Sequence, residues 1–117
     1  MKNIYLIHGW GGNPNEPMLV WLKIELEKVG HKVVVPEMPD TEHPVIEKWV
    51  GKLNESVKQI NENTILIGHS IGCQAILRYL AGLSDNSKID KIILIAPWIG
   101  VGYENHGGRR RRWHSHC

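Results

Sequence analysis

The chain has 117 residues and a formal net charge of +2, and 42% of its residues are hydrophobic. This length is typical of one domain, and a chain of this size buries roughly two thirds of its unfolded surface. The hydrophobic fraction argues against a disordered body. No apolar run approaches the roughly 20 residues that a membrane span needs, so we expect no membrane association.

The positive charge is concentrated at the C-terminal end. Residues 1–99 carry nine Lys, one Arg and eleven acidic residues, a balance of −1, whereas residues 100–117 carry four Arg and one acid, a balance of +3. The body therefore gives no reason to expect nucleic-acid binding. The N-terminus has no signal-peptide pattern, and two cysteines, Cys73 and Cys117, make no disulfide framework. These features predict a cytoplasmic protein.

The first half of the chain alternates between short apolar runs and segments with helical periodicity. Residues 3–8 predict a buried strand, followed by a glycine- and proline-rich loop. Residues 17–29 predict a helix with Pro17 in its first turn, and residues 32–36 predict a second strand. After a polar loop, residues 44–60 predict a second helix, opened by Pro44.

The second half continues the same alternation. Residues 64–68 predict a third strand, residues 71–83 a third helix and residues 91–96 a fourth strand. The order favours an α/β fold with a parallel sheet covered by helices on both faces. After Trp98 neither period continues, so we divide the chain into a core at residues 1–99 and an unstructured or aberrant basic tail at residues 100–117.

A serine lies between two glycines where the third strand ends and the third helix begins. The stretch Gly68-His69-Ser70-Ile71-Gly72 matches the nucleophile elbow, G-x-S-x-G. A tight turn here holds the hydroxyl clear of the sheet, and the glycines avoid collisions with neighbouring backbone. Ser70 is therefore the candidate nucleophile. The alternative interpretation is a glycine-rich turn in which Ser70 serves only as a helix N-cap.

A second motif, His8-Gly9-Trp10-Gly11-Gly12, follows the first strand. Functional residues collect at the carboxyl ends of parallel strands, so we consider it together with Ser70. We expect the backbone amides of Trp10 and Ile71 to form an oxyanion hole. His8 is interpreted as a residue that pins this loop, and His69 as a packing residue rather than a base. Such chemistry needs no cofactor, and we predict no metal site.

These stretches resemble the α/β-hydrolase superfamily. More narrowly, the chain is similar to the group of small serine hydrolases that includes bacterial YdeN and retinoblastoma-binding protein nine. The resemblance covers residues 2 to about 99 and is carried by "YLIHGWGGNP", "VVVPEMPDTEHPVIEKWV", "TILIGHSIGCQAILRYL" and "IILIAPW". It implies esterase-like hydrolysis of a small acyl substrate, with Ser70 as nucleophile.

The chain lacks a recognisable triad acid and histidine. On this fold the triad runs Ser, then Asp or Glu, then His, and the resemblance places both partners after later strands. Glu104, His106, His114 and His116 follow the fourth strand, but none has that context. We therefore expect a core truncated to about four strands. Its fourth strand would leave an apolar edge that is open to self-association.

Two other interpretations stay open. The first is a non-catalytic truncated or frameshifted product, which predicts negligible turnover of short acyl esters. The second is a binding domain on the same fold. The tail also has simple interpretations. Residues 109–112 are expected to be solvated arginines, and His114, His116 and Cys117 predict only adventitious metal binding.

Overall fold

The computed structural model describes residues 1–96, which form one sheet with helices on both of its faces. The strands are β1 (Asn3–Ile7), β2 (Lys32–Val34), β3 (Thr64–His69) and β4 (Lys91–Ile95), and the helices are α1 (Pro17–Lys28), α2 (Ile46–Ser56) and α3 (Gly72–Ala81). All neighbouring strands are parallel, in the order β2-β1-β3-β4. The predicted α/β fold is confirmed. The boundary at residue 99 and the tail that follows it lie outside the described residues.

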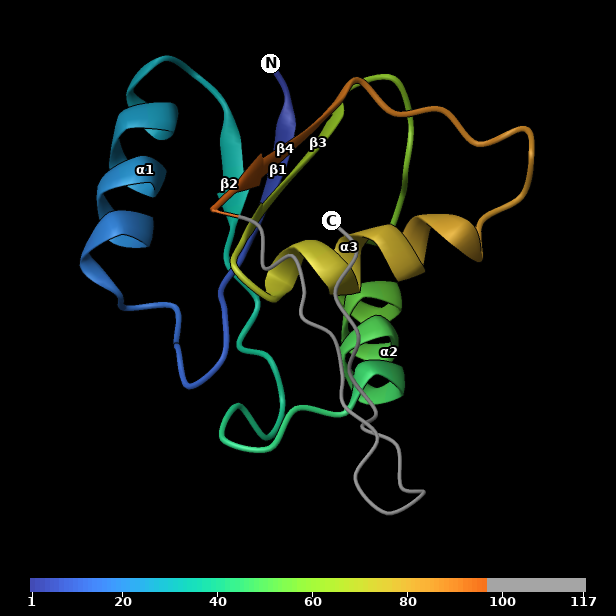
Figure 1. Cartoon of the computed structure of the whole chain (residues 1–117). Coiled ribbons are helices and arrows are strands. Elements are labelled where there is room, and N and C mark those ends of the chain that lie inside the picture. The colour runs from blue at the N-terminus through green and yellow to red at the C-terminus, as the bar shows by residue number, and fades with distance from the viewer. Residues whose placement is uncertain (97–117) are drawn as a thin grey trace.

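The sheet separates two apolar cores. Helix α1 covers one face, and α2 and α3 cover the other (Figure 1). Side chains alternate between the two faces along each strand, so neighbouring residues of β1 enter different cores. Leu6 packs with Leu19 of α1, whereas Ile7 packs with Trp49 of α2 and Ile76 of α3. None of the helices within residues 1–96 is long and apolar enough to cross a membrane.

Most elements are one to a few residues shorter than the sequence predicts, and two of them, β2 and α2, show a local reason. Strand β2 ends at Val34 rather than at residue 36. Proline has no backbone N–H, so Pro36 cannot donate to a continued ladder. Helix α2 begins at Ile46 rather than Pro44, because Val45 is still extended at φ −117° and ψ 119°. The same helix ends at Ser56, since Val57 leaves helical geometry at ψ 88°, although the Val57 side chain stays in the core.

The strand order creates a topological switch point between β1 and β3. From β1 the chain crosses to β2 on one side, and β3 then pairs with the other side of β1. In open parallel sheets, ligands bind outside the carboxyl ends of the strands at such a switch. The segments that begin at His8 and Ser70 leave the sheet at this position.

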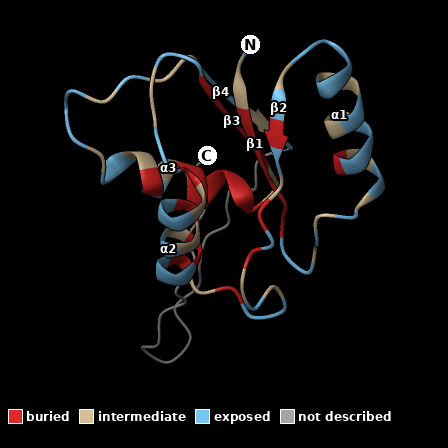
Figure 2. Cartoon of the chain, turned by 180° about the vertical axis from the view of Figure 1, so that it is seen from behind, coloured by how far each residue is buried: buried red, intermediate tan, exposed pale blue. Residues whose placement is uncertain are grey.

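Strand β4 forms an open edge of the sheet. Its burial differs from that of β1 and β3, whose residues are almost all buried (Figure 2). Ile92 and Ile93 expose 39% and 42% of their surface, and they lie on opposite faces because side chains alternate along a strand. Within the described residues, the expected apolar edge is therefore present.

Candidate active site

Ser70 occupies a strained turn between β3 and α3. Its φ is +57°, in the left-handed region that costs a non-glycine residue about 1–2 kcal/mol. The backbone on both sides holds it there. The Ser70 N–H donates to the carbonyl oxygen of Ile95 in β4 (3.0 Å), and the Cys73 N–H donates to the carbonyl oxygen of Ser70 (3.1 Å). Ser70 as a residue is half-buried, so the strained turn is partly open to solvent.

Two flanking glycines allow α3 to approach the sheet closely. A Cβ on Gly72 would lie 2.6 Å from the carbonyl oxygen of Ile7 and 2.7 Å from that of His8. A Cβ on Gly68 would lie 2.8 Å from Cδ1 of Ile76. The clash at Gly72 is with backbone, which a rotamer change cannot relieve. The glycines of the G-x-S-x-G pattern therefore have a steric reason that is independent of any chemistry.

A third glycine brings the loop after β1 against the serine. A Cβ on Gly9 would lie 3.0 Å from Cβ of Ser70 and 3.5 Å from its Oγ. The backbone of this loop thus lies against the serine side chain without a methyl group between them. The next residue, Trp10, is 51% exposed, and its indole N–H donates to the carbonyl oxygen of Glu42 (3.2 Å). The fold therefore brings the motif at residues 8–12 next to the motif at residues 68–72.

The start of α3 also faces this region. Ile71 precedes the helix with φ −70° and ψ −14°, and its side chain is fully buried. The Cys73 N–H already has the Ser70 carbonyl oxygen as acceptor, and the Gln74 N–H has that of Ile71. The amides of Ile71 and Gly72 come earlier in the chain than these two hydrogen-bonded amides. The first amides of a helix carry a partial positive charge, which favours an anion beside Ser70.

His8 is completely buried and has a partner at each ring nitrogen. The Met38 N–H donates to its Nε2 (3.0 Å), and its Nδ1 lies 3.2 Å from the carbonyl oxygen of Gly9. The ring packs edge-to-face on Trp49, with centroids 5.8 Å apart. Burial lowers the pKa of His8 below its ordinary value of 6.5, which favours the neutral ring. Through these contacts His8 joins the segment after β1 to the segment after β2.

The comparisons with known proteins give the family. A family model described as serine hydrolase matches residues 4–111. The chain belongs to the serine hydrolase family. It is 35% identical over 95 residues to the "Putative hydrolase YdeN" of Bacillus subtilis (strain 168), a match that covers 81% of this chain and 50% of that protein. The crystal structure of the ydeN gene product from B. subtilis superposes with a TM-score of 0.76 over 80% of this chain. This chain therefore spans about half the length of the relative that it matches.

Within residues 1–96, this serine hydrolase brings no acid or base into hydrogen-bonding contact with Ser70. His69 is half-buried at the end of β3, and its Nδ1 is buried without a hydrogen-bond partner. Asp40 lies in an exposed turn at φ +53°. Glu104, His106, His114, His116, Cys117 and the arginines at 109–112 lie outside the described residues. The described part also has no group of three or more His, Cys, Asp or Glu side chains that could hold a metal ion.

Two structural contributions to the site were missed at the sequence level. The loop at residues 37–43 contacts the loop after β1, and Ile95 holds the Ser70 amide. The stretch "VVVPEMPDTEHPVIEKWV", which carries part of the resemblance, includes this loop and is the sequence signal for the first contribution. No sequence signal indicated the second, because a backbone carbonyl can belong to any residue type.

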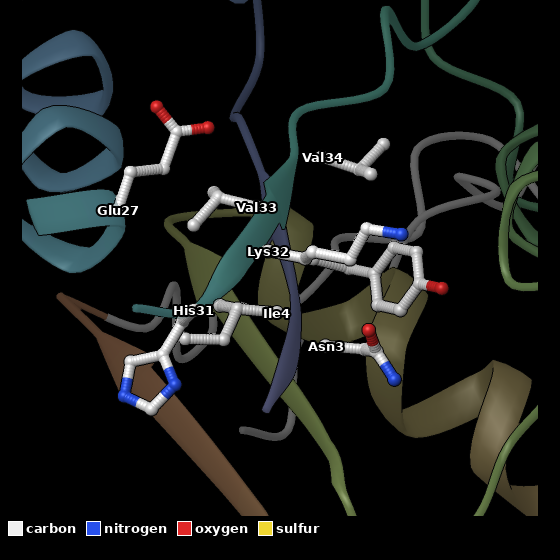
Figure 3. A pocket seen from close by; sticks show the side chains of 8 residues that line it. Asn3, Ile4, Glu27, His31, Lys32, Val33 and Val34 are labelled. Carbon is white, nitrogen blue, oxygen red and sulfur yellow. The ribbon is translucent and has the colours of Figure 1, made fainter. Parts of the chain in front are cut away.

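A separate pocket of about 430 Å³ lies at the other end of the sheet. It is lined by the starts of β1 and β2 and by the end of α1, among them Asn3, Lys32 and Glu27. Figure 3 shows Lys32 and Glu27 on opposite sides of the β2 strand. The pocket therefore wraps around the sheet edge and does not include Ser70.

Proposed function

We propose that this chain carries the nucleophile-bearing half of an esterase-like serine hydrolase that acts on a small acyl substrate. The observation that carries the proposal is Ser70 itself. It has a φ of +57°, lies between a buried strand and a helix start, and has the Gly9 backbone against its hydroxyl. Backbone strain of this kind persists only where the surroundings enforce it, and it clusters at functional sites.

The proposed reaction begins when Oγ of Ser70 attacks the carbonyl carbon of an ester. A new C–O bond forms, the hydroxyl proton passes to a general base, and the carbonyl oxygen becomes an oxyanion. The intermediate then expels the alcohol, which takes the proton from the base and leaves an acyl-serine. Water repeats the sequence, releasing the carboxylic acid and restoring the hydroxyl.

The amides of Ile71 and Trp10 are the proposed oxyanion donors. Ile71 is the N-cap of α3 and follows Ser70, and Trp10 follows Gly9, whose backbone lies against the serine side chain. A donor of this kind lowers the barrier by about 3 kcal/mol, because it is already oriented when the charge develops. Gly9, Gly68 and Gly72 support the geometry by allowing the close approaches described above.

The base and the acid are proposed to lie in sequence outside residues 1–96. The match to the relative covers only 50% of that protein, and the triad order on this fold places both groups after the serine. A serine without its base is a weak nucleophile, and triad variants of proteases retain only about 10³-fold over the uncatalysed rate. We therefore expect slow acylation from residues 1–96 alone.

A fluorophosphonate probe tests the assignment on the whole chain. We expect labelling at Ser70, located by peptide mass spectrometry, and its loss in Ser70→Ala. Ser84→Ala is the matched control because Ser84 is an exposed loop serine. Labelling that survives in Ser70→Ala, or a folded chain that never reacts, would refute the nucleophile assignment. The competing interpretation, a non-catalytic product, predicts no turnover of a short acyl ester, and turnover that requires Ser70 would exclude it.

We also propose that the β4 edge pairs with β4 of a second copy of this chain. Two β4 strands paired antiparallel about Ile93 place each Lys91 beside residue 95 of the other copy, which keeps the two ammonium groups apart. Light scattering is expected to show a concentration-dependent dimer that Ile93→Lys abolishes. Val29→Lys, at a 69% exposed site in a different element, serves as control. A monomer at every concentration would overturn this proposal.

A further inference from the structure

We propose that His8 is a positioning residue that joins the loop after β1 to the loop after β2. In this role its ring carries the hydrogen on Nδ1. The connection that His8 makes between the two loops, called the joint below, determines where the Trp10 amide lies. Only the last step rests on the proposed function. The joint itself is a property of the fold.

The ring contacts define the tautomer. An amide can only donate, so the bond from the Met38 N–H requires a lone pair on Nε2 of His8 (3.0 Å). The hydrogen of the neutral ring is then on Nδ1, which donates to the carbonyl oxygen of Gly9 (3.2 Å). Both nitrogens are used, and the side chain is 0% exposed. A proton on Nε2 would place two donors against each other.

Two further hydrogen bonds fasten the same pair of loops. The Gly11 N–H donates to the carbonyl oxygen of Thr41 (2.8 Å), and the Trp10 indole N–H donates to that of Glu42 (3.2 Å). The loop at residues 37–43 is in turn held by α2, because the Trp49 indole N–H donates to the carbonyl oxygen of Pro39 (2.7 Å). The backbone of Trp10 thus lies between two anchored residues, His8 and Gly11.

Charged groups act on His8 from two elements. The carboxylates of Glu16, at the start of α1, and Glu37, in the loop after β2, both favour the protonated ring, whereas burial opposes it more strongly and lowers the pKa. The contact from α2 is the uncharged edge of Trp49. The neutral ring that the hydrogen bonds require is therefore also the form that the surroundings favour at neutral pH.

Amide hydrogen exchange on three variants tests the joint. In His8→Gln the side-chain oxygen can replace Nε2 as acceptor, whereas in His8→Asn the shorter side chain cannot reach Met38. We expect His8→Asn to accelerate exchange at Met38 and Gly11 by about tenfold, as loss of one hydrogen bond would, while His8→Gln stays near the wild type. His31→Asn is the control, because His31 also accepts an amide hydrogen bond, from Lys2 (3.0 Å) at the other end of the sheet.

The outcomes separate this proposal from the function. Unchanged Gly11 exchange in His8→Asn, with Leu66 of β3 still protected, would overturn the joint. If His8→Asn does not fold, nitrogen NMR of the wild-type ring decides: a hydrogen on Nε2 overturns the proposal. Fluorophosphonate labelling is then compared in the His8 variants. Slower labelling in His8→Asn than in His8→Gln is expected if the joint positions Trp10, whereas a wild-type chain that never labels refutes the nucleophile and leaves the exchange result standing.

Discussion

The strain at Ser70 can be measured by comparing two variants that both lack the hydroxyl. Ser70 has a φ of +57°, where alanine is penalised by about 1–2 kcal/mol and glycine is not. Glycine loses more entropy on folding, which removes about 0.5–1 kcal/mol of that advantage. Ser70→Gly should therefore be more stable than Ser70→Ala by about 1 kcal/mol or slightly less, which corresponds to a melting temperature about 4 °C higher in a domain of this size.

Urea unfolding followed by tryptophan fluorescence gives both free energies of unfolding. Ser56 provides a matched pair, because it is the last residue of α2 and has an ordinary helical backbone. At that position the order should reverse, and Ser56→Ala should be the more stable variant. Equal stability of Ser70→Gly and Ser70→Ala, together with the expected order at Ser56, would show that the turn stores no strain.

Three further changes test the packing and the buried histidine. Gly72→Ala should lower the free energy of unfolding by about 1–3 kcal/mol, because the new Cβ would lie 2.6 Å from the Ile7 carbonyl oxygen, whereas Gly51→Ala in α2 has open space and should raise it by about 0.5–1 kcal/mol. Equal effects in a urea titration would contradict the steric argument. Leu53→Ala, at a fully buried site, should cost about 2–5 kcal/mol in the same assay, and a loss below 1 kcal/mol would refute its place in the core. Burial lowers the pKa of His8 below 6.5 in the folded state, so the unfolded state takes up a proton first as the pH falls. The contribution of His8 to stability is therefore full above about pH 6.5 and is lost as the pH drops through the lowered pKa. His8→Gln should flatten this slope between pH 7 and 5, and an unchanged slope would exclude His8 as its source.

The arrangement of strands and helices could be predicted from the sequence, because the hydrophobic residues form continuous runs in the strands and follow a helical period in the helices. Apolar runs such as residues 64–68 fill a sheet that is buried on both faces, and amphipathic segments such as residues 71–83 cover it. The positions of Ser70 and Gly9 were also predictable, since parallel strands collect their carboxyl ends at one edge. Errors were confined to element ends, where a single residue such as Pro36 or Val45 decides.

The supporting contacts of the site were not predictable in the same way. The bond between Met38 and His8 joins residues 30 positions apart, and the bond from Ser70 to Ile95 joins two different strand ends. Both depend on how the elements are placed, and both use backbone atoms that every residue has. The tautomer of His8 likewise follows only once its two neighbours are known.

The hydrogen bond from Ser70 to Ile95 ties the proposed nucleophile to the least protected strand of the described sheet. Fraying of that strand would release the amide that holds the serine in its unusual conformation. Any polypeptide that docks along the outer side of β4 would then do more than cover isoleucines, because it would also make the proposed nucleophile more rigid. If Ser70 is the nucleophile, its reactivity and the occupancy of the β4 edge are thermodynamically linked, so each can serve as a reporter of the other.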